Sequence, residues 1–152
     1  MAITTNAICN TFKKELLQGS HDFDASTDVY KLALYKDTAT LGKSTTNYSP
    51  NLGATGTEVT SANYTAGGSA LVNQGVKVSD SIAITNFANL SFVNVTLTAR
   101  GALIYNTTTD GGSGTTDAVC VLDFGGVKTA TAGTFTIQFP AFTTSAAIIR
   151  LT

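Results

Sequence analysis

Apolar and polar positions alternate along much of the second half of the chain. In residues 134–139, the apolar Phe135, Ile137 and Phe139 alternate with Thr136 and Gln138. Because successive side chains of a strand point to opposite faces, this pattern predicts a half-buried strand whose aromatic face meets a core. Similar apolar runs recur at short intervals, and we expect strands at residues 70–78, 81–87, 92–105, 118–124, 134–139 and 147–151, with a bend allowed in the longest.

Turn-forming residues separate these runs. Asp110–Gly114 predicts a flexible hairpin tip, and Gly125-Gly126 predicts a second turn. Earlier in the chain, Val29–Tyr35 is apolar on both faces, which is typical of a central strand. About seven strands joined by turns, without helices between them, indicate a mainly β fold. We expect an antiparallel β-sandwich or jelly roll, with a partly closed barrel as the alternative.

The N-terminal segment, residues 1–20, has a helical period instead. Its apolar side chains recur at four-residue intervals, at Ile8, Phe12 and Leu16. We expect a helix that begins at Thr5 or Asn6, runs to Gln18 and is terminated by Gly19. The opposite face is polar and carries Asn10, Lys13, Lys14 and Gln18.

This helix allows two interpretations. It covers an open end or face of the sheet, as a lone amphipathic helix beside an all-β region commonly does, or it docks into a partner subunit. In the second case the interface includes the apolar side chains Ile8, Phe12, Leu16 and Leu17.

Residues 36–68 form a long polar stretch rich in Thr, Ser, Asn and Gly, with room for one short strand near Tyr64. Loops of this length in compact domains are commonly functional, because surface segments can carry binding residues without disturbing the core. A clamped or disordered segment with only a spacing role is the other interpretation. If the loop binds a partner, Tyr48 and Tyr64 are its candidate interface residues.

Composition narrows the classes of partner. The 152 residues suit one domain, only 12% are charged and the net charge is −1, with Lys and Arg scattered along the chain. We therefore expect neither a nucleic acid nor an anionic membrane as partner, because both require clustered cations. No run reaches the roughly 20 apolar residues of a membrane span. The N-terminus lacks a basic start and an apolar run, so we expect synthesis in a cytoplasm without export.

Few residues suit catalysis or metal binding. His21 is the only histidine, and its neighbours Asp22 and Asp24 fit a solvated loop better than an acid–base or metal site. Glu15 and Glu58 are the only glutamates, and nothing around them indicates a raised pKa. We expect no catalytic residue, no cofactor and no metal.

Three polar or reactive side chains are expected in structural roles. Cys9 and Cys120 have no metal-ligand spacing and are interpreted as two buried thiols, although a disulfide between them is not excluded by the sequence. Arg100 interrupts the apolar run 97–105. A contact with Asp123 on a neighbouring strand is the expected arrangement, and a ligand-binding arginine is the alternative.

Several blocks of the chain, taken in order, resemble a family of small structural proteins of tailed bacteriophages. The blocks are Phe12–Leu17, Lys31–Tyr35, Tyr64–Gly68, Ala99–Asn106, Val121–Gly125 and Gly133–Pro140. Each block alone is generic, so the resemblance depends on their succession, and it covers most of the chain. Residues 47–63 and 107–116 depart from the family pattern, which leaves any role of these loops open.

The resemblance implies a virion component without enzymatic activity or cofactor. Its partners would be other virion proteins, foremost the major capsid protein, and further copies of itself in a homo-oligomer. The first hypothesis is a capsid decoration (cement) protein that binds and stabilises the assembled head. The alternatives are a tail or head-fibre component, and a β-sandwich that binds host glycans with Tyr48 or Tyr64 as its aromatic platform.

Overall fold

The computed structural model describes residues 3–24, 27–109 and 114–152 and contains one helix and eight strands in these ranges. In chain order the elements are β1 (Ala7–Ile8), α1 (Asn10–Leu17), β2 (Tyr30–Tyr35), β3 (Ser69–Ala70), β4 (Asn73–Ser79), β5 (Ile82–Phe87), β6 (Leu90–Asn106), β7 (Asp117–Ile137) and β8 (Ile149–Leu151). Most of the predicted strand runs contain an observed strand. The predicted hairpin tip lies mostly outside the described residues.

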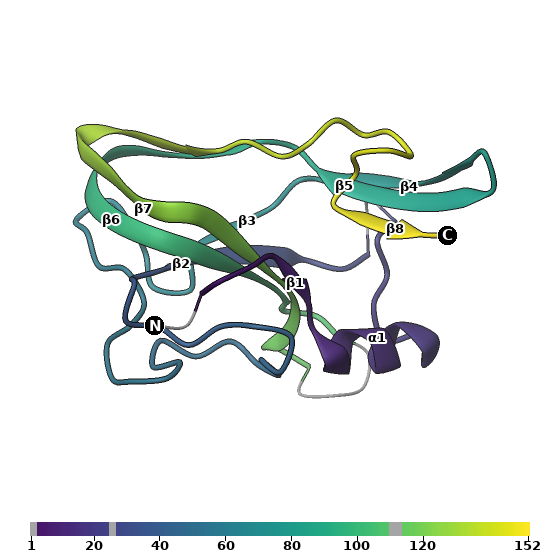
Figure 1. Ribbon diagram of the computed structural model, residues 1–152, viewed down its shortest axis with the longest axis horizontal. Helices are drawn as coiled ribbons and strands as arrows, with labels where there is room; N and C mark the ends of the chain where they lie inside the picture. The colour runs from purple at the N-terminus through teal and green to yellow at the C-terminus, as the bar shows by residue number, and fades with distance from the viewer. Residues whose placement is uncertain (1–2, 25–26, 110–113) are drawn as a thin grey trace.

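The strands form two antiparallel sheets, as expected for a β-sandwich. One sheet has the order β1-β7-β6-β2-β3 and the other has the order β4-β5-β8 (Figure 1). The central position predicted for Val29–Tyr35 is confirmed, since β2 pairs with β6 on one side and with β3 on the other. The prediction of a mainly β fold with one N-terminal helix is therefore confirmed.

The β6–β7 ribbon is longer than predicted and bends between the two layers of the molecule (Figure 1). Residues 118–124 and 134–139 were expected as separate strands, but the first and most of the second belong to one strand, and Gly125-Gly126 lies inside it. Irregular backbone at Asn94, Gly125 and Ala132, all with positive φ, lets the ribbon curve without ending.

The ring contact between Phe124 and Phe135 measures this curvature. Their ring centroids are 6.0 Å apart. Eleven residues of straight strand would separate them by about 36 Å. The two halves of β7 therefore fold back over one another, and their apolar side chains share one concave interior.

The helix begins later than predicted. Ala7 and Ile8 form β1, paired with Val121 and Cys120 of β7, so the helix starts only at Asn10. In β1 the backbone groups of these residues form hydrogen bonds with an edge of β7 that would otherwise be open. One additional helical turn would leave its first N–H groups without partners, because the helix has no side-chain cap. The predicted termination at Gly19, with φ 73°, agrees with a helix that ends at Leu17 and is capped by Gln18.

A chain of aromatic rings joins the helix to both sheets. Phe12 of α1 meets Phe23 edge to face, and Phe23 stacks on Tyr30 of β2 with centroids 4.5 Å apart. Tyr30 contacts Phe87 of β5, which contacts Phe139 beyond β7. All five rings are buried, so the helix covers the sandwich through Phe12.

Residues 36–68 are ordered against the main sheet although they form only isolated bridges. Their backbone groups form hydrogen bonds with the part of the β2 edge that the short β3 leaves unpaired. The backbone N–H of Val59 donates to the Leu34 carbonyl, and the backbone N–H of Lys36 donates to the Thr57 carbonyl. The stretch is therefore a clamped segment and not a solvated excursion.

Candidate interaction surfaces

A buried carboxylate fixes the long loop. Glu58 is 3% exposed, and its two oxygens accept hydrogen bonds from the Tyr48 hydroxyl at 2.7 Å, the Tyr64 hydroxyl at 2.8 Å and the Gly67 N–H at 2.7 Å. The Tyr64 hydroxyl in turn accepts the Leu34 N–H at 2.8 Å. Three donors compensate the desolvation of this carboxylate, so its role in the described structure is to hold the loop.

The two candidate loop tyrosines belong to this cluster. Tyr64 is buried, and burial raises the pKa of its hydroxyl above the ordinary value. Tyr48 is half-buried, with its ring stacked on Tyr105 at 4.5 Å between centroids. Burial also raises the pKa of Tyr105, to about 12. Neither Tyr48 nor Tyr64 presents both faces of its ring to solvent.

His21 lies in a second buried network. Asn106 accepts the Thr108 N–H with its oxygen, and its amide nitrogen donates to Asp28 at 2.6 Å and to Nδ1 of His21 at 3.1 Å. Since the backbone donor fixes the amide orientation, Nδ1 must be the acceptor, and Nε2 carries the proton that is donated to Glu15 at 2.8 Å. His21 therefore joins α1 to β6.

The acidic residues next to His21 lie at the surface. Asp22 and Asp24 are both exposed. Within residues 3–24, 27–109 and 114–152, no group of three or more His, Cys, Asp or Glu side chains is arranged to hold a metal ion. The same ranges contain no helix with the length and apolar character needed to cross a membrane.

The two cysteines are free and buried, as predicted. Cys9 donates its N–H to the Val119 carbonyl, next to the β1–β7 pair of Ile8 and Cys120. Burial raises the pKa of the Cys9 thiol to about 12 and raises that of Cys120 as well. Both thiols therefore stay protonated and poorly nucleophilic near neutral pH.

The predicted Arg100–Asp123 contact is confirmed. The guanidinium hydrogen-bonds the Asp123 carboxylate and lies 3.7 Å from Asp37. The hydrogen bond from Arg100 lowers the pKa of Asp123 below its ordinary value. The arginine thus pairs β6 with β7, as a structural residue would.

The apolar side chains of the N-terminal segment face different environments. Phe12 is in the core, Leu16 is half-buried against it, and Leu17 is 91% exposed. Ile8 was expected on the helix, but it lies in β1 and is half-buried. Their role in an interface stays a prediction, for which Leu17 is the most available side chain.

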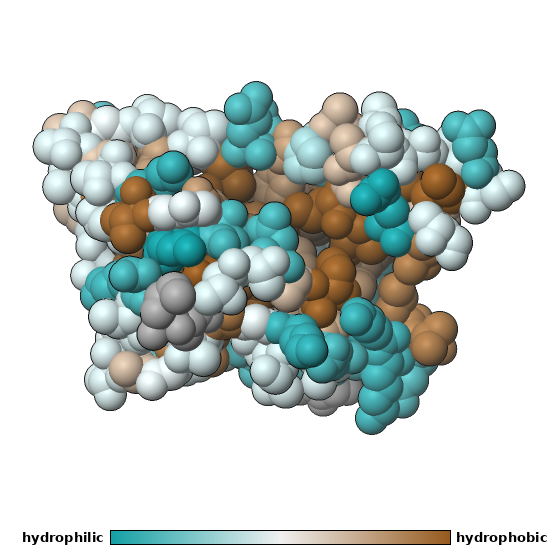
Figure 2. Space-filling view, viewed as in Figure 1, coloured by the Kyte–Doolittle hydropathy of each residue, from teal (hydrophilic) through white to brown (hydrophobic). Residues whose placement is uncertain are grey.

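A groove of about 830 Å³ opens beside Ile8. It lies between β1, the curved β7 and the segment that leads to β8, and its floor includes Phe124, Phe135 and Ile137. Figure 2 shows apolar surface in the hollowed middle of this face. Sequence reasoning missed the groove because it arises from the curvature of β7.

The projecting β4–β5 hairpin carries a second apolar surface, in a region where the sequence predicted strands without assigning their faces. Val76 and Val78 of β4 are 58% and 72% exposed. They share one face of the sheet with Leu151 of β8, which pairs with Ala83 opposite Val78 and is 54% exposed. The alternation of Val76 and Val78 with polar residues in the sequence indicates one apolar face of a strand, and in the structure this face is exposed.

Comparison with known proteins adds no relative. No protein-family model, no curated protein and no solved structure matches the chain.

Proposed function

We propose that the chain is a non-enzymatic structural subunit of a bacteriophage particle, and that it acts as a capsid decoration protein bound to the major capsid protein. The proposal rests on the succession of sequence blocks that resemble small structural proteins of tailed phages. The architecture agrees with such a role, because a clamped β-sandwich is a rigid body suited to repeated contacts with other subunits.

The structural observation that supports this proposal is the contrast between paired polar side chains and exposed apolar ones. The buried ionisable residues Glu58 and His21 are occupied by hydrogen bonds within the chain, and Arg100 is paired with Asp123. Large apolar side chains such as Leu17, in contrast, are exposed. A surface of this kind favours protein contacts over chemistry.

Leu17 is the side chain we assign to the capsid contact. It is the most exposed of the large apolar side chains in the described ranges and lies at the end of α1. The helix is anchored through Phe12, so it can present Leu17 in a fixed position. This assignment keeps the helix as both a cover of the sandwich and a docking element.

The test is the position and copy number of the protein in purified phage particles, imaged at residue resolution. We expect copies in multiples of the shell symmetry on the outside of the head. Presence only along the tail or on a fibre would support the alternative of a tail or head-fibre component. Absence from the particle would refute a structural role.

A point substitution tests the helix. Removal of residues 1–19 is unsuitable, because it also deletes β1 and the core residue Phe12. Leu17→Asp should lower occupancy on the head, whereas Gln18→Asp, which adds the same charge at the adjacent exposed residue, should not. Equal occupancy of both variants would contradict the contact at Leu17.

The glycan-binding alternative has less support. Tyr64 is 6% exposed, and the hydroxyls of Tyr64 and Tyr48 are both bonded to Glu58. Binding to a glycan array that disappears in Tyr48→Ala, with the fold retained, would nevertheless revive it.

A further inference from the structure

Two open sheet edges at separate places on the molecule have complementary surfaces. β4 is the edge strand of the small sheet. On the side away from β6, β7 pairs with β1 at Cys120 and Val121 and with Asn47 at Asp117, and in the described ranges no strand pairs with residues 124–137 on that side. Unpaired edges of this kind are templates for another strand.

The apolar surfaces match as well. Val76 and Val78 are two positions apart in β4, so they point to the same face, and both are exposed. The groove beside β7 offers an apolar floor that includes Phe124 and Ile137. One surface projects and the other is hollow.

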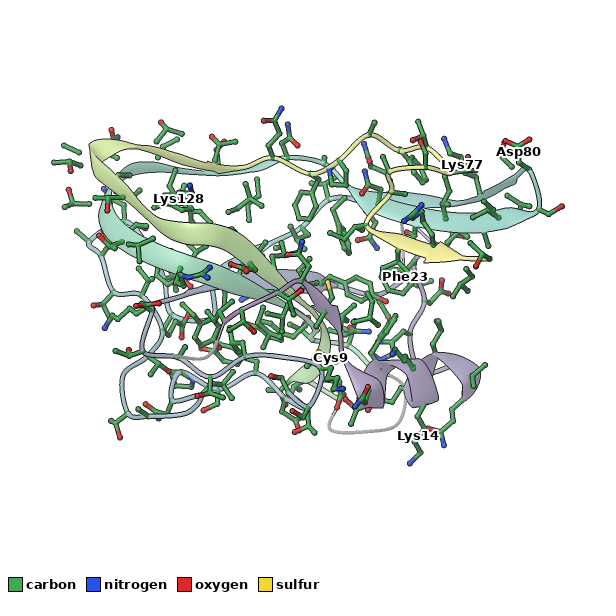
Figure 3. All side chains as sticks on the ribbon, in the orientation of Figure 1. Cys9, Lys14, Phe23, Lys77, Asp80 and Lys128 are labelled. Carbon is green, nitrogen blue, oxygen red and sulfur yellow. The ribbon has the colours of Figure 1, made fainter. Side chains whose placement is uncertain are left out.

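The tip of the hairpin and the rim of the groove carry charges of opposite sign. Asp80 is exposed at the turn of the β4–β5 hairpin, and Lys128 is exposed at the rim of the groove. In the described ranges neither forms an ion pair. Figure 3 shows Asp80 at the tip of the hairpin and Lys128 on the distant part of β7. The two side chains therefore cannot meet within one chain.

We propose that the β4–β5 hairpin of one copy of this chain binds in the β7 groove of a second copy. Val76 and Val78 lie on the groove floor, and Asp80 pairs with Lys128 of the neighbour. Because the two surfaces differ, the contact is head-to-tail and produces a closed ring or an open filament, not a two-fold dimer. The inference holds whether or not the chain is part of a virion.

Sedimentation velocity of the full chain over a range of concentrations tests the contact. The wild-type chain should associate, and Val78→Asp should weaken association by about tenfold or more, which is the contribution of one buried valine. Lys128→Glu should also weaken it. Val93→Asp on β6 is the control, because Val93 is 59% exposed and belongs to neither surface. Wild-type chain that remains monomeric, or equal effects of Val78→Asp and Val93→Asp, would overturn the proposal.

Two complementation experiments test the head-to-tail geometry. Asp80→Lys combined with Lys128→Glu in one chain should restore association that each single substitution weakens. A mixture of Val78→Asp and Lys128→Glu chains should form a one-to-one heterodimer, because one chain keeps an intact groove and the other an intact hairpin. Failure of both rescues, with all variants folded by circular dichroism, would refute the arrangement.

Discussion

The buried carboxylate of Glu58 gives the sharpest test of how the long loop is held. Glu58→Gln keeps the shape of the side chain but removes its charge. The remaining oxygen can still accept from Tyr64 and Gly67, whereas the new amide faces the Tyr48 hydroxyl, which must turn its hydrogen away. Hydrogen bonds to a charged group contribute about 1.5–3 kcal/mol each. We expect the free energy of unfolding to fall by about 1–2 kcal/mol in Glu58→Gln and by more than about 4 kcal/mol in Glu58→Ala.

The tyrosines provide a matched comparison. Tyr48→Phe removes one hydrogen bond at a half-buried position, so we expect a loss of about 1.5 kcal/mol. Tyr64→Phe removes a bond to the same carboxylate and also leaves the buried Leu34 N–H without its acceptor. Because the unpaired Leu34 N–H adds its own cost, we expect the free energy of unfolding of Tyr64→Phe to fall by about 3 kcal/mol in total.

Urea unfolding of the variants measures these differences. A difference of about 1.5 kcal/mol between Tyr64→Phe and Tyr48→Phe should appear as a shift in midpoint at constant m-value. Thermal midpoints should differ by about 3–6 °C in a chain of this size. Equal midpoints for the two tyrosine variants, or a neutral Glu58→Gln, would refute the role assigned to the cluster.

Three further predictions address backbone and charge. Gly68→Ala should destabilise far more than Gly56→Ala in urea unfolding, because both glycines have positive φ but only at Gly68 would the new Cβ clash with a backbone oxygen, that of Leu32. The folded pKa of Cys9, about 12, exceeds the unfolded value, so the free energy of unfolding should fall as pH rises above about 8.5. Cys9→Ala should reduce that slope, and an unchanged slope would contradict it. Because Arg100 lowers the pKa of Asp123, Asp123→Asn should lower the melting temperature at pH 7 and have little effect near pH 2, where the carboxyl of the parent chain is protonated; equal effects at both pH values would argue against this linkage.

Local pattern was sufficient for much of the fold. The apolar runs located most strands, the double-faced run Val29–Tyr35 indicated the central strand, and Gly19 marked the end of the helix. Arg100 and Asp123 could be paired because each interrupts an apolar run on neighbouring strands. In these cases the determining signal lies within a few residues of the feature.

The errors arose where distant residues decide the structure. Ile8 fits a helical period, but its pairing with Cys120 places it in a strand. Gly125-Gly126 has the composition of a turn, yet β6 continues to pair with β7 beyond it, so the glycines provide curvature. The role of Glu58 also has no local signal, because its partners are brought to it by the fold.

The bend of the β6–β7 ribbon has a consequence for how the molecule opens. The two halves of the bent ribbon consist of the same two paired strands, so neither half can lose its structure without breaking the pairing of β6 with β7. Amide hydrogens in the two halves of β6 should therefore exchange with solvent through the same global unfolding event. The β4–β5–β8 sheet uses no segment of the ribbon and is free to open at lower free energy. Resistance to mechanical and thermal unfolding should accordingly be concentrated in the β6–β7 ribbon.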